Sequence, residues 1–263
     1  MTITDIRVRK VPSDGVSALD QQGQALLKKA LGKLNKEELF NAPKMEQVDY
    51  ETTYSANVFK EFNEQIKTKA TPKVEQKISF LQFNNFLIGN IFKTINTETQ
   101  RISYLVKVVS LDIEQGIKKT ITYLDDELLN EWEQLSTESK LTIPEDYKHL
   151  TSDEIVQDND VLSAQGWGLP CLQNGCCSFR YKGKRSNPLV KYNWCGANCG
   201  SGPTVNALDN CCKYHDHCYD ANTEYPARCG CDRIIIECAN QTDEAGTSRI
   251  VGVFSAKMVA MGC

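Results

Sequence analysis

The first 170 residues of this 263-residue chain contain no cysteine, and all 12 cysteines lie between Cys171 and Cys263. Long apolar runs are also missing, because the longest, such as Ile250–Phe254, fall far short of the roughly 20 residues that a membrane-spanning helix requires. Residues 1–10 lack the apolar segment of a secretory signal. The first half has no P-loop, dinucleotide-binding glycine motif or internal repeat, which disfavours nucleotide-binding and repeat architectures there.

The distributions of cysteine and of charge divide the chain in two. An even number of cysteines within about 100 residues is typical of a disulfide framework formed in an oxidising compartment, so we expect a secreted, extracellular protein. Residues 1–164 hold 20 Lys and Arg against 26 Asp and Glu, whereas residues 165–263 hold 10 against 8. The net charge of the whole chain is −4, and no nucleic-acid partner is expected. We predict a front domain over residues 1–135, a linker over 136–164 and a second domain over 165–263.

The front domain is predicted to be an α+β unit with one helix followed by an antiparallel sheet. Apolar residues recur at helical spacing over Ser17–Lys36. Residues 45–126 alternate as strands do, most clearly over Gln47–Tyr54, Ile102–Val109 and Ile117–Leu124. Residues 112–116 between the last two predict a hairpin connection. Residues 125–150 are predicted to be helical and then linking, and Pro144 with the acidic run 153–160 indicates a solvated connector.

The second domain is organised around residues 209–219, which read Asp-Asn-Cys-Cys-Lys-Tyr-His-Asp-His-Cys-Tyr. In a helix, Cys211, His215 and Cys218 share one face. Cys231 and Cys238 are again seven residues apart, so two antiparallel helices could be bridged by Cys211–Cys238 and Cys218–Cys231. That arrangement would bring Asp232 to within about one helical turn of His215. A histidine braced by a carboxylate, beside a second carboxylate and a glycine-rich loop, indicates a chemical site.

These residues resemble the secreted, calcium-dependent phospholipase A2 family over about the last hundred residues of the chain. The resemblance rests on Trp194-Cys195-Gly196…Gly200-Ser201-Gly202 as the calcium loop, Cys211-Cys212-x-x-His215-Asp216-x-Cys218-Tyr219 as the first active-site helix, and Cys229-x-Cys231-Asp232…Cys238 as the second. The chain departs from the family where Asn198 takes a position that is usually glycine and Cys199 follows it. The segment 220–228 is too short for the β-hairpin that some members carry, so Tyr225 is only a candidate for the family's second supporting tyrosine.

The resemblance implies a function and a set of site residues. The implied reaction is calcium-dependent hydrolysis of the sn-2 ester of glycerophospholipids at a membrane or micelle surface. His215 is implied as general base, Asp232 as its carboxylate partner and Tyr219 as support for Asp232. The implied calcium ligands are the Asp216 carboxylate and the backbone carbonyls of Trp194, Gly196 and Asn198. The resemblance also implies a Cys195–Cys212 disulfide and three further bonds of unassigned pairing among Cys171, Cys176, Cys177, Cys199, Cys229 and Cys263.

Several alternatives stay open at this point. A zinc site is one alternative, because several potential ligands crowd together: Cys211, Cys212, His215, His217 and Cys218, with Cys195 and Cys199 as a further pair. Ligands in one rigid helix, however, point in several directions. The second domain could also be a catalytically silent membrane-binding or toxin module. The front domain could be a pro-region, an inhibitor in cis, an export aid or a targeting module. Residues 180–191 could contact anionic lipid or form a solvated loop, and residues 248–261 predict a terminal strand or helix that packs on the core.

Overall fold

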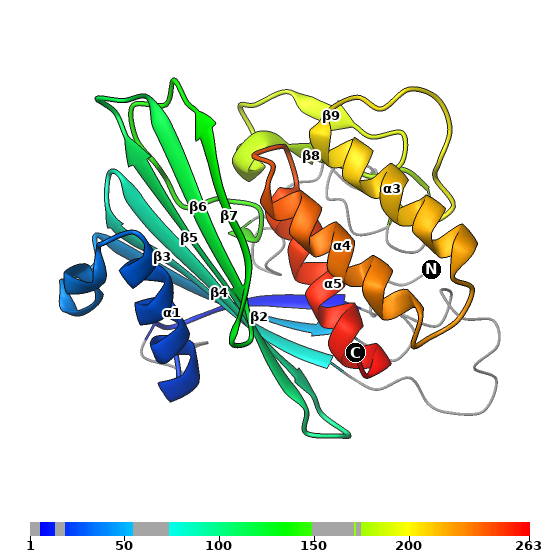
Figure 1. Ribbon diagram of the computed structural model, residues 1–263, viewed down its shortest axis with the longest axis horizontal. Helices are drawn as coiled ribbons and strands as arrows, with labels where there is room; N and C mark the ends of the chain where they lie inside the picture. The colour runs from blue at the N-terminus through cyan, green and yellow to red at the C-terminus, as the bar shows by residue number, and fades with distance from the viewer. Residues whose placement is uncertain (1–5, 14–18, 55–73, 149–170, 172–174) are drawn as a thin grey trace.

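The computed structural model describes residues 6–13, 19–54, 74–148, 171 and 175–263. Its front part is a seven-stranded antiparallel sheet whose strands follow one another in sequence order. One helix, α1 (Gln21–Lys33), covers one face of the sheet, and α4 (Arg228–Asn240) and α5 (Thr247–Met261) lie on the other side (Figure 1). The strands are β1 (Ile6–Val11), β2 (Glu46–Tyr54), β3 (Val74–Asn84), β4 (Leu87–Asn96), β5 (Ile102–Asp112), β6 (Ile117–Leu124) and β7 (Glu127–Leu135).

The sheet is buried on both faces because apolar residues point to each side in turn. In β5, Tyr104, Val106 and Val108 pack in the core that contains α1. Leu105, on the opposite face, belongs to the core that is shared with the C-terminal helices. Antiparallel strands with both faces covered carry near-continuous apolar patterns, which is why the alternation over residues 45–126 is visible but incomplete in the sequence.

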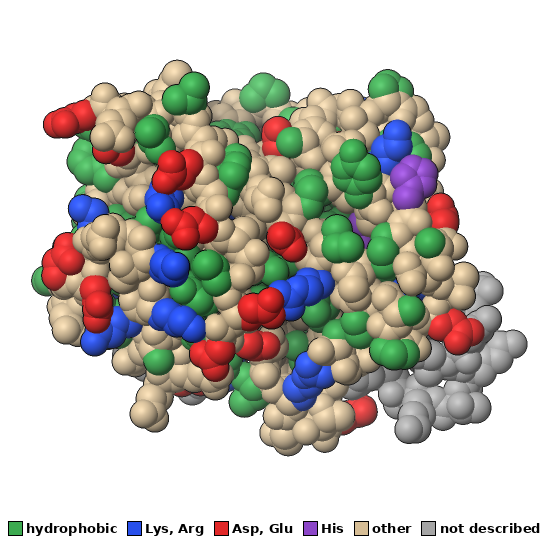
Figure 2. Space-filling model, in the orientation of Figure 1, with side chains coloured by type: hydrophobic (Ala, Val, Ile, Leu, Met, Phe, Trp, Pro, Cys, Tyr) green, Lys and Arg blue, Asp and Glu red, His purple; other side chains and the backbone are tan. Residues whose placement is uncertain are grey.

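The C-terminal part is mainly helical. The helix α3 (Ala207–Ala221) runs beside α4, and α5 lies between this pair and the sheet (Figure 1). A short hairpin, β8 (Ser178–Arg180) and β9 (Leu189–Lys191), flanks the start of this part. Within the hairpin the Lys182 ammonium is paired with Glu138, so one cation of the basic stretch 180–191 faces the protein. On the face shown in Figure 2, basic and acidic side chains lie next to one another where the sheet meets the C-terminal helices.

Most of the predicted elements are confirmed. The helix expected over Ser17–Lys36 is α1, in its described part, and it begins after Asp20, whose carboxylate accepts the Gly23 amide. The three predicted strands are β2, β5 and β6, and the hairpin between β5 and β6 is present. The stretch 248–261 forms the helix α5, packed on the core as expected. Together these elements make an α+β fold, as predicted.

The prediction of a helix after residue 125 is wrong, because residues 127–135 form the edge strand β7. The segment is rich in Glu and Leu, which are good helix formers, but its pairing with β6 outweighs that propensity. Lys119 in β6 reinforces the pairing by ion pairs to Glu131 at 2.7 Å and to Glu133 at 3.2 Å. Tertiary pairing therefore decides the state of this segment.

Within the linker predicted over 136–164, the prediction of solvation is wrong for residues 141–147, which the structure describes as packed. Leu141, Ile143 and Tyr147 are buried, and the Tyr147 ring lies 5.8 Å from the ring of Phe80. The Gln82 amide nitrogen donates to the Leu141 carbonyl at 3.1 Å, so the backbone is also fixed. Apolar side chains spaced along the segment hold it in the core between sheet and helices. Residues 149–164, including the acidic run, lie outside the described residues.

The two parts of the chain share one core and are also joined by buried polar contacts. Three sheet side chains donate to helix carbonyls: Gln76 to Gly252 at 2.9 Å, Asn96 to Val259 at 3.4 Å, and Asn130 to Glu237 at 3.1 Å. Such bonds depend on position, unlike apolar packing, so they fix the register of α5 and α4 on the sheet. None of the helices in the described residues is long and apolar enough to cross a membrane.

Candidate functional site

Disulfides hold the two helices that were predicted to carry the site. The predicted bridges Cys211–Cys238 and Cys218–Cys231 are both present, each with Cα atoms 5.7 Å apart, and they join α3 to α4. The Cys195–Cys212 bond is present as well. The other pairs, which the sequence left unassigned, are Cys171–Cys177, Cys176–Cys199 and Cys229–Cys263. All 12 cysteines are therefore bonded, which leaves no thiolate for the zinc alternative.

The bridged helices bring His215 and Asp232 together. The His215 Nε2 atom lies 3.2 Å from Asp232 Oδ1, and the two residues are only 4% and 0% exposed. The hydroxyls of Tyr219 and Tyr225 donate to the same carboxylate, the latter at 2.6 Å to Oδ2. Tyr225 thus takes the place of a second supporting tyrosine even though the connection between the helices is short. With three donors on one carboxylate, the imidazole is fixed with its Nδ1 side away from Asp232.

The electrostatics keep this carboxylate ionised. Burial alone would raise the pKa of Asp232, but the His215 hydrogen bond, the Lys257 charge and the two tyrosine hydroxyls together lower it. Burial and the Asp232 charge raise the pKa of both Tyr219 and Tyr225, so these hydroxyls remain neutral donors. The pair therefore consists of an ionised carboxylate and an imidazole that donates to it from Nε2.

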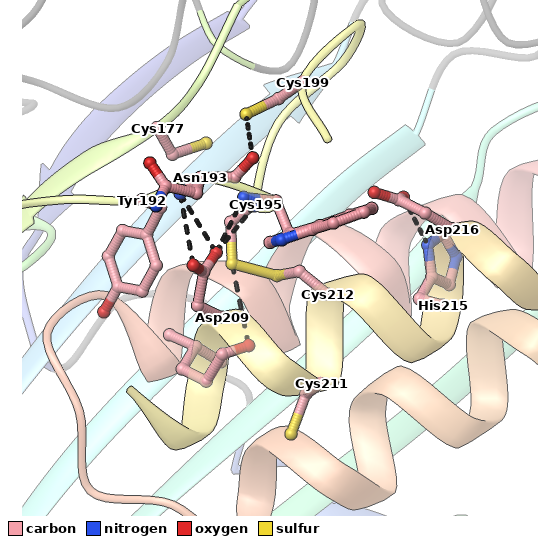
Figure 3. Close-up of a disulfide and its surroundings, with 12 residues drawn as sticks. Cys177, Tyr192, Asn193, Cys195, Cys199, Asp209, Cys211, Cys212, His215 and Asp216 are labelled. Atoms are coloured by element: carbon pink, nitrogen blue, oxygen red, sulfur yellow. Dashed lines mark hydrogen bonds and ion pairs between the residues drawn. A yellow bond between two sulfur atoms is a disulfide. The ribbon is translucent and has the colours of Figure 1, made fainter. Parts of the chain in front are cut away.

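A second carboxylate faces the other ring nitrogen. Asp216 Oδ1 lies 3.7 Å from His215 Nδ1 (Figure 3). The other oxygen, Asp216 Oδ2, is buried and has no hydrogen-bond partner. Burial raises the pKa of this carboxyl. Because a buried, unpartnered carboxylate oxygen is costly, this site suits a cation, which would supply the missing partner.

The glycine-rich loop comes close to that unpartnered oxygen. A Cβ built on Gly200 would lie 3.7 Å from Asp216 Oδ2, which places the loop backbone beside the carboxylate. Gly196 adopts a φ of 135°, and a Cβ there would lie 2.2 Å from the Gly175 carbonyl oxygen, so only glycine fits. Asn198 has a φ of 56°, and Asn is among the few residues other than glycine that tolerate this left-handed conformation. This explains how Asn198 can stand where the resemblance expects glycine.

Asp209 anchors the start of this loop to α3. Its buried carboxylate accepts the backbone amides of Asn193, Trp194 and Cys195 at 2.8–3.2 Å (Figure 3). It also accepts the Val205 amide at 3.0 Å. Bonds from several amides to one carboxylate are among the strongest that a backbone makes. We did not predict this role, because an acidic residue in the first turn of a helix is common for reasons of the helix dipole alone.

Trp194 and His217 mark the outer side of the same region. The Trp194 indole donates to the Gly202 carbonyl at 3.0 Å, and the Lys213 ammonium lies 5.0 Å from the centre of its ring. The His217 ring lies 5.6 Å from the Trp194 ring, and its side chain is 56% exposed. His217 therefore belongs to the surface, whereas His215 belongs to the buried pair. Figure 2 shows a histidine side chain at the surface of this part of the molecule.

Two side chains of α5 complete the site. The Phe254 ring packs edge-on against the His215 ring, with centroids 4.6 Å apart. The Lys257 ammonium donates to the Tyr219 hydroxyl at 2.7 Å and lies 4.0 Å from Asp232 Oδ1. Neither role was predictable, since one Phe and one Lys in a largely apolar stretch indicate only a packing element.

A cavity among the described residues lies away from this chemistry. It has a volume of about 90 Å³ and lies between the sheet and the α4–α5 connection, with Lys107, Trp132 and Asn240 in its lining. None of the predicted site residues lines it. The convergence of ionisable groups, rather than cavity size, identifies the candidate site.

A cation at this site would depend on the backbone. Within the described part of the chain, no group of three or more His, Cys, Asp or Glu side chains converges as a metal site. Asp216 with carbonyl oxygens of the loop is nevertheless a donor set of the kind that calcium takes. Comparison with models of known protein families finds no match for this chain, and comparison with solved structures finds none either.

Proposed function

We propose that this protein is a calcium-dependent phospholipase A2-type esterase that hydrolyses the sn-2 ester of glycerophospholipids. The observation that supports this most strongly is the orientation of His215. Its Nε2 faces Asp232 at 3.2 Å, and its Nδ1 faces the carboxylate of Asp216, whose second oxygen lacks a partner. A general base that is held by one carboxylate and lies beside a second carboxylate with an unpartnered oxygen suits ester hydrolysis by activated water.

The proposed role of His215 follows from its tautomer. Because the Nε2 proton is donated to Asp232, Nδ1 carries a lone pair and can accept a proton from water. The water oxygen forms a bond to the ester carbon while its proton passes to Nδ1, and the ionised Asp232 stabilises the resulting imidazolium. As the tetrahedral intermediate collapses, the imidazolium returns the proton to the departing lysophospholipid oxygen. The products are a fatty acid and a lysophospholipid.

The calcium part of the proposal rests on the loop and on Asp216. The carboxylate of Asp216 and the backbone carbonyls of Trp194, Gly196 and Asn198 would hold the ion. When bound, calcium would polarise the ester carbonyl, stabilise the oxyanion and hold the substrate phosphate. Asp209 would contribute by fixing the loop, since it accepts the amides that lead into it.

The proposed place of action is outside the cell, on a phospholipid membrane or micelle surface. Six disulfides in the C-terminal part are typical of extracellular proteins. One observation favours the alternative of a catalytically silent membrane-binding module: His215 is only 4% exposed and Phe254 packs against its ring. Turnover therefore requires movement that admits an ester and a water to Nδ1, and an assay of turnover separates the two functions.

The test compares two histidines of the same helix. His215→Gln should reduce fatty-acid release from mixed phospholipid vesicles by at least about 100-fold, because it removes the general base. The control His217→Gln changes the exposed ring and should leave release unchanged. Calcium binding, measured by isothermal titration calorimetry, should be similar in both variants. Equal activity of His215→Gln and wild type would refute the proposed mechanism, and vesicle binding without any release in wild type would favour the silent module.

A further inference from the structure

Lys257 lies inside the candidate site but has no role in the mechanism described above. It belongs to α5, is 1% exposed, and donates to the Tyr219 hydroxyl at 2.7 Å. Its ammonium lies 4.0 Å from Asp232 Oδ1 and packs over the rings of Tyr219 and Phe254, with the nitrogen 4.6 Å and 5.5 Å from their centres. A lysine is rarely buried so completely unless it is paired, so its position needs a physical reason.

The reason lies in the charge of Asp232. This carboxylate is completely buried. Its hydrogen-bond donors are the His215 ring and two tyrosine hydroxyls, and none of them carries a positive charge before the imidazole takes up a proton. Hydrogen bonds alone do not supply a counter-charge, and an uncompensated buried charge is strongly unfavourable. The Lys257 ammonium provides that counter-charge on the side of Tyr219. It therefore favours the ionised form of Asp232, which is the form that accepts from His215 Nε2.

The donors and acceptors form a consistent chain. Lys257 donates to the Tyr219 oxygen, and the Tyr219 hydroxyl spends its single proton on Asp232 Oδ1. A hydroxyl that accepts from a cation becomes a stronger donor, so the ammonium acts on Asp232 both directly and through Tyr219. The same oxygen, Oδ1, also accepts from His215. The position of the Lys257 nitrogen is thus coupled to the hydrogen bond that orients the imidazole.

The front sheet fixes where Lys257 lies. Val253 and Ala256, on the sheet side of α5, pack with Tyr54 and Val74. Gln76 donates to the Gly252 carbonyl, which prevents α5 from sliding on the sheet. A shift of one helical residue would move the ammonium by about 1.5 Å along the axis and 100° around it, enough to remove it from Tyr219.

We propose that Lys257 is a positioning residue whose ammonium keeps Asp232 ionised and hydrogen-bonded to His215. Its kinetic consequence rests on the proposed function, whereas the coupling between Lys257 and Asp232 does not.

The kinetic test uses Lys257→Met, which removes the charge and keeps an unbranched apolar stem beside the two rings. The expected result is a fall in kcat of about 10- to 100-fold with little change in KM, because the imidazole loses its orientation while the molecular surface is unaltered, since Lys257 is buried. Lys107→Met is the matched control: Lys107 is a partly buried lysine of β5 outside the site, and burial lowers its pKa to about 8 as it does that of Lys257. Its kcat should match wild type. A Lys257→Met enzyme with unchanged kcat, or an equal loss in Lys107→Met, would overturn the proposal.

A stability cycle tests the same pairing without reference to activity. The melting temperatures of wild type, Lys257→Met, Asp232→Asn and the double variant are compared by circular dichroism. If the charges are coupled, the double variant should melt at least about 3 °C higher than the temperature expected from adding the two single shifts to the wild-type value. Shifts that add to within about 1 °C would overturn the proposal. Should Lys257→Met fail to fold, recovery of folding in the Asp232→Asn background supports the pairing, and no recovery refutes it. If wild type releases no fatty acid at all, the proposed function fails while this cycle still decides the role of Lys257.

Discussion

The front and C-terminal parts of this chain are stabilised in different ways. The described front part, through Leu135, has no cysteine and relies on a continuous seven-stranded ladder with apolar cores on both faces. The C-terminal part carries six disulfides and buries several ionisable groups, among them Asp209, His215, Asp232 and Lys257. Buried charges cost stability, and a small helical unit has little apolar surface to compensate. The comparison suggests that cross-links and the neighbouring sheet allow the chemical site to exist.

The most severe way to break this comparison is to remove the front part. If the disulfides sufficed alone, residues 165–263 would fold by themselves, and an inhibitory front part would make them more active. The structure predicts the opposite, a complete loss of release activity, since truncation exposes Val253, Ala256 and Ala260 of α5 and removes the Gln76 and Asn96 bonds to it. The measurement is fatty-acid release and circular dichroism of residues 165–263. A folded fragment with raised activity would show that the front part is an inhibitor in cis.

Asp209→Asn tests how much the C-terminal part depends on one buried carboxylate. An Asn side chain has one carbonyl oxygen and one NH₂ group, and the NH₂ group cannot accept from the backbone amides that donate to Asp209. About two charge-assisted hydrogen bonds are therefore lost, which should lower the free energy of unfolding by about 4 kcal/mol. Calcium affinity should also fall, because the loop is no longer fixed. Asp220→Asn, whose side chain is 82% exposed in the wild type, should be neutral in urea unfolding and in calcium titration. Equal stability of the two variants would show that the loop is held by its disulfides alone.

The pH dependence of stability measures what the burial of Lys257 costs the C-terminal part. Burial lowers the pKa of Lys257 from 10.5 to about 8. Between these values the unfolded chain binds more protons than the folded one, so the contribution of Lys257 to stability rises with pH from about 8 to about 10.5, by about 3 kcal/mol in total. Urea unfolding across this range should show a steeper rise for wild type than for Lys257→Met. Parallel curves would mean that Lys257 titrates normally in the folded protein.

The smallest expected effect on stability comes from replacing two helical glycines, one packed against the sheet and one exposed. Gly252 of α5 faces the sheet side, where a Cβ would lie 2.4 Å from the Tyr147 hydroxyl and 3.1 Å from the Phe92 ring. Gly252→Ala should therefore destabilise by about 2 kcal/mol through overpacking. Gly230 of α4 is exposed with no atom within 4 Å of such a Cβ, so Gly230→Ala should stabilise by about 0.5–1 kcal/mol. Thermal unfolding of both variants provides the check, and a destabilised Gly230→Ala would contradict the packing described for α4.

The predictable parts of the fold were those governed by local pattern. The period of the apolar residues predicted α1 and three strands, and cysteines seven residues apart predicted both bridges between α3 and α4. β7 was missed because its Glu and Leu residues favour a helix until β6 pairs with them. Tyr147 was missed because the burial of a single aromatic residue after Pro144 depends on the sheet face opposite it.

In the candidate site too, local patterns predicted some residues, whereas others depend on contacts between distant parts of the chain. His215, Asp216 and Asp232 were predictable because the helical period and cysteine spacing place them together. Asp209, Phe254 and Lys257 were not, since each acts on residues that are distant in sequence or on backbone amides. Their roles depend on how α5 and the loop dock, and no local pattern encodes that docking.

The central claim is calcium-dependent hydrolysis of one particular ester, and position-specific labelling tests it most directly. Vesicles of phospholipid with a labelled acyl chain at sn-2 are incubated with the wild-type protein and calcium, in parallel with vesicles labelled at sn-1 and with a chelator control. The proposed function predicts labelled fatty acid from the sn-2 vesicles alone, and none when calcium is chelated. Release from sn-1 at a comparable rate, release in the presence of the chelator, or no release from either label would contradict it.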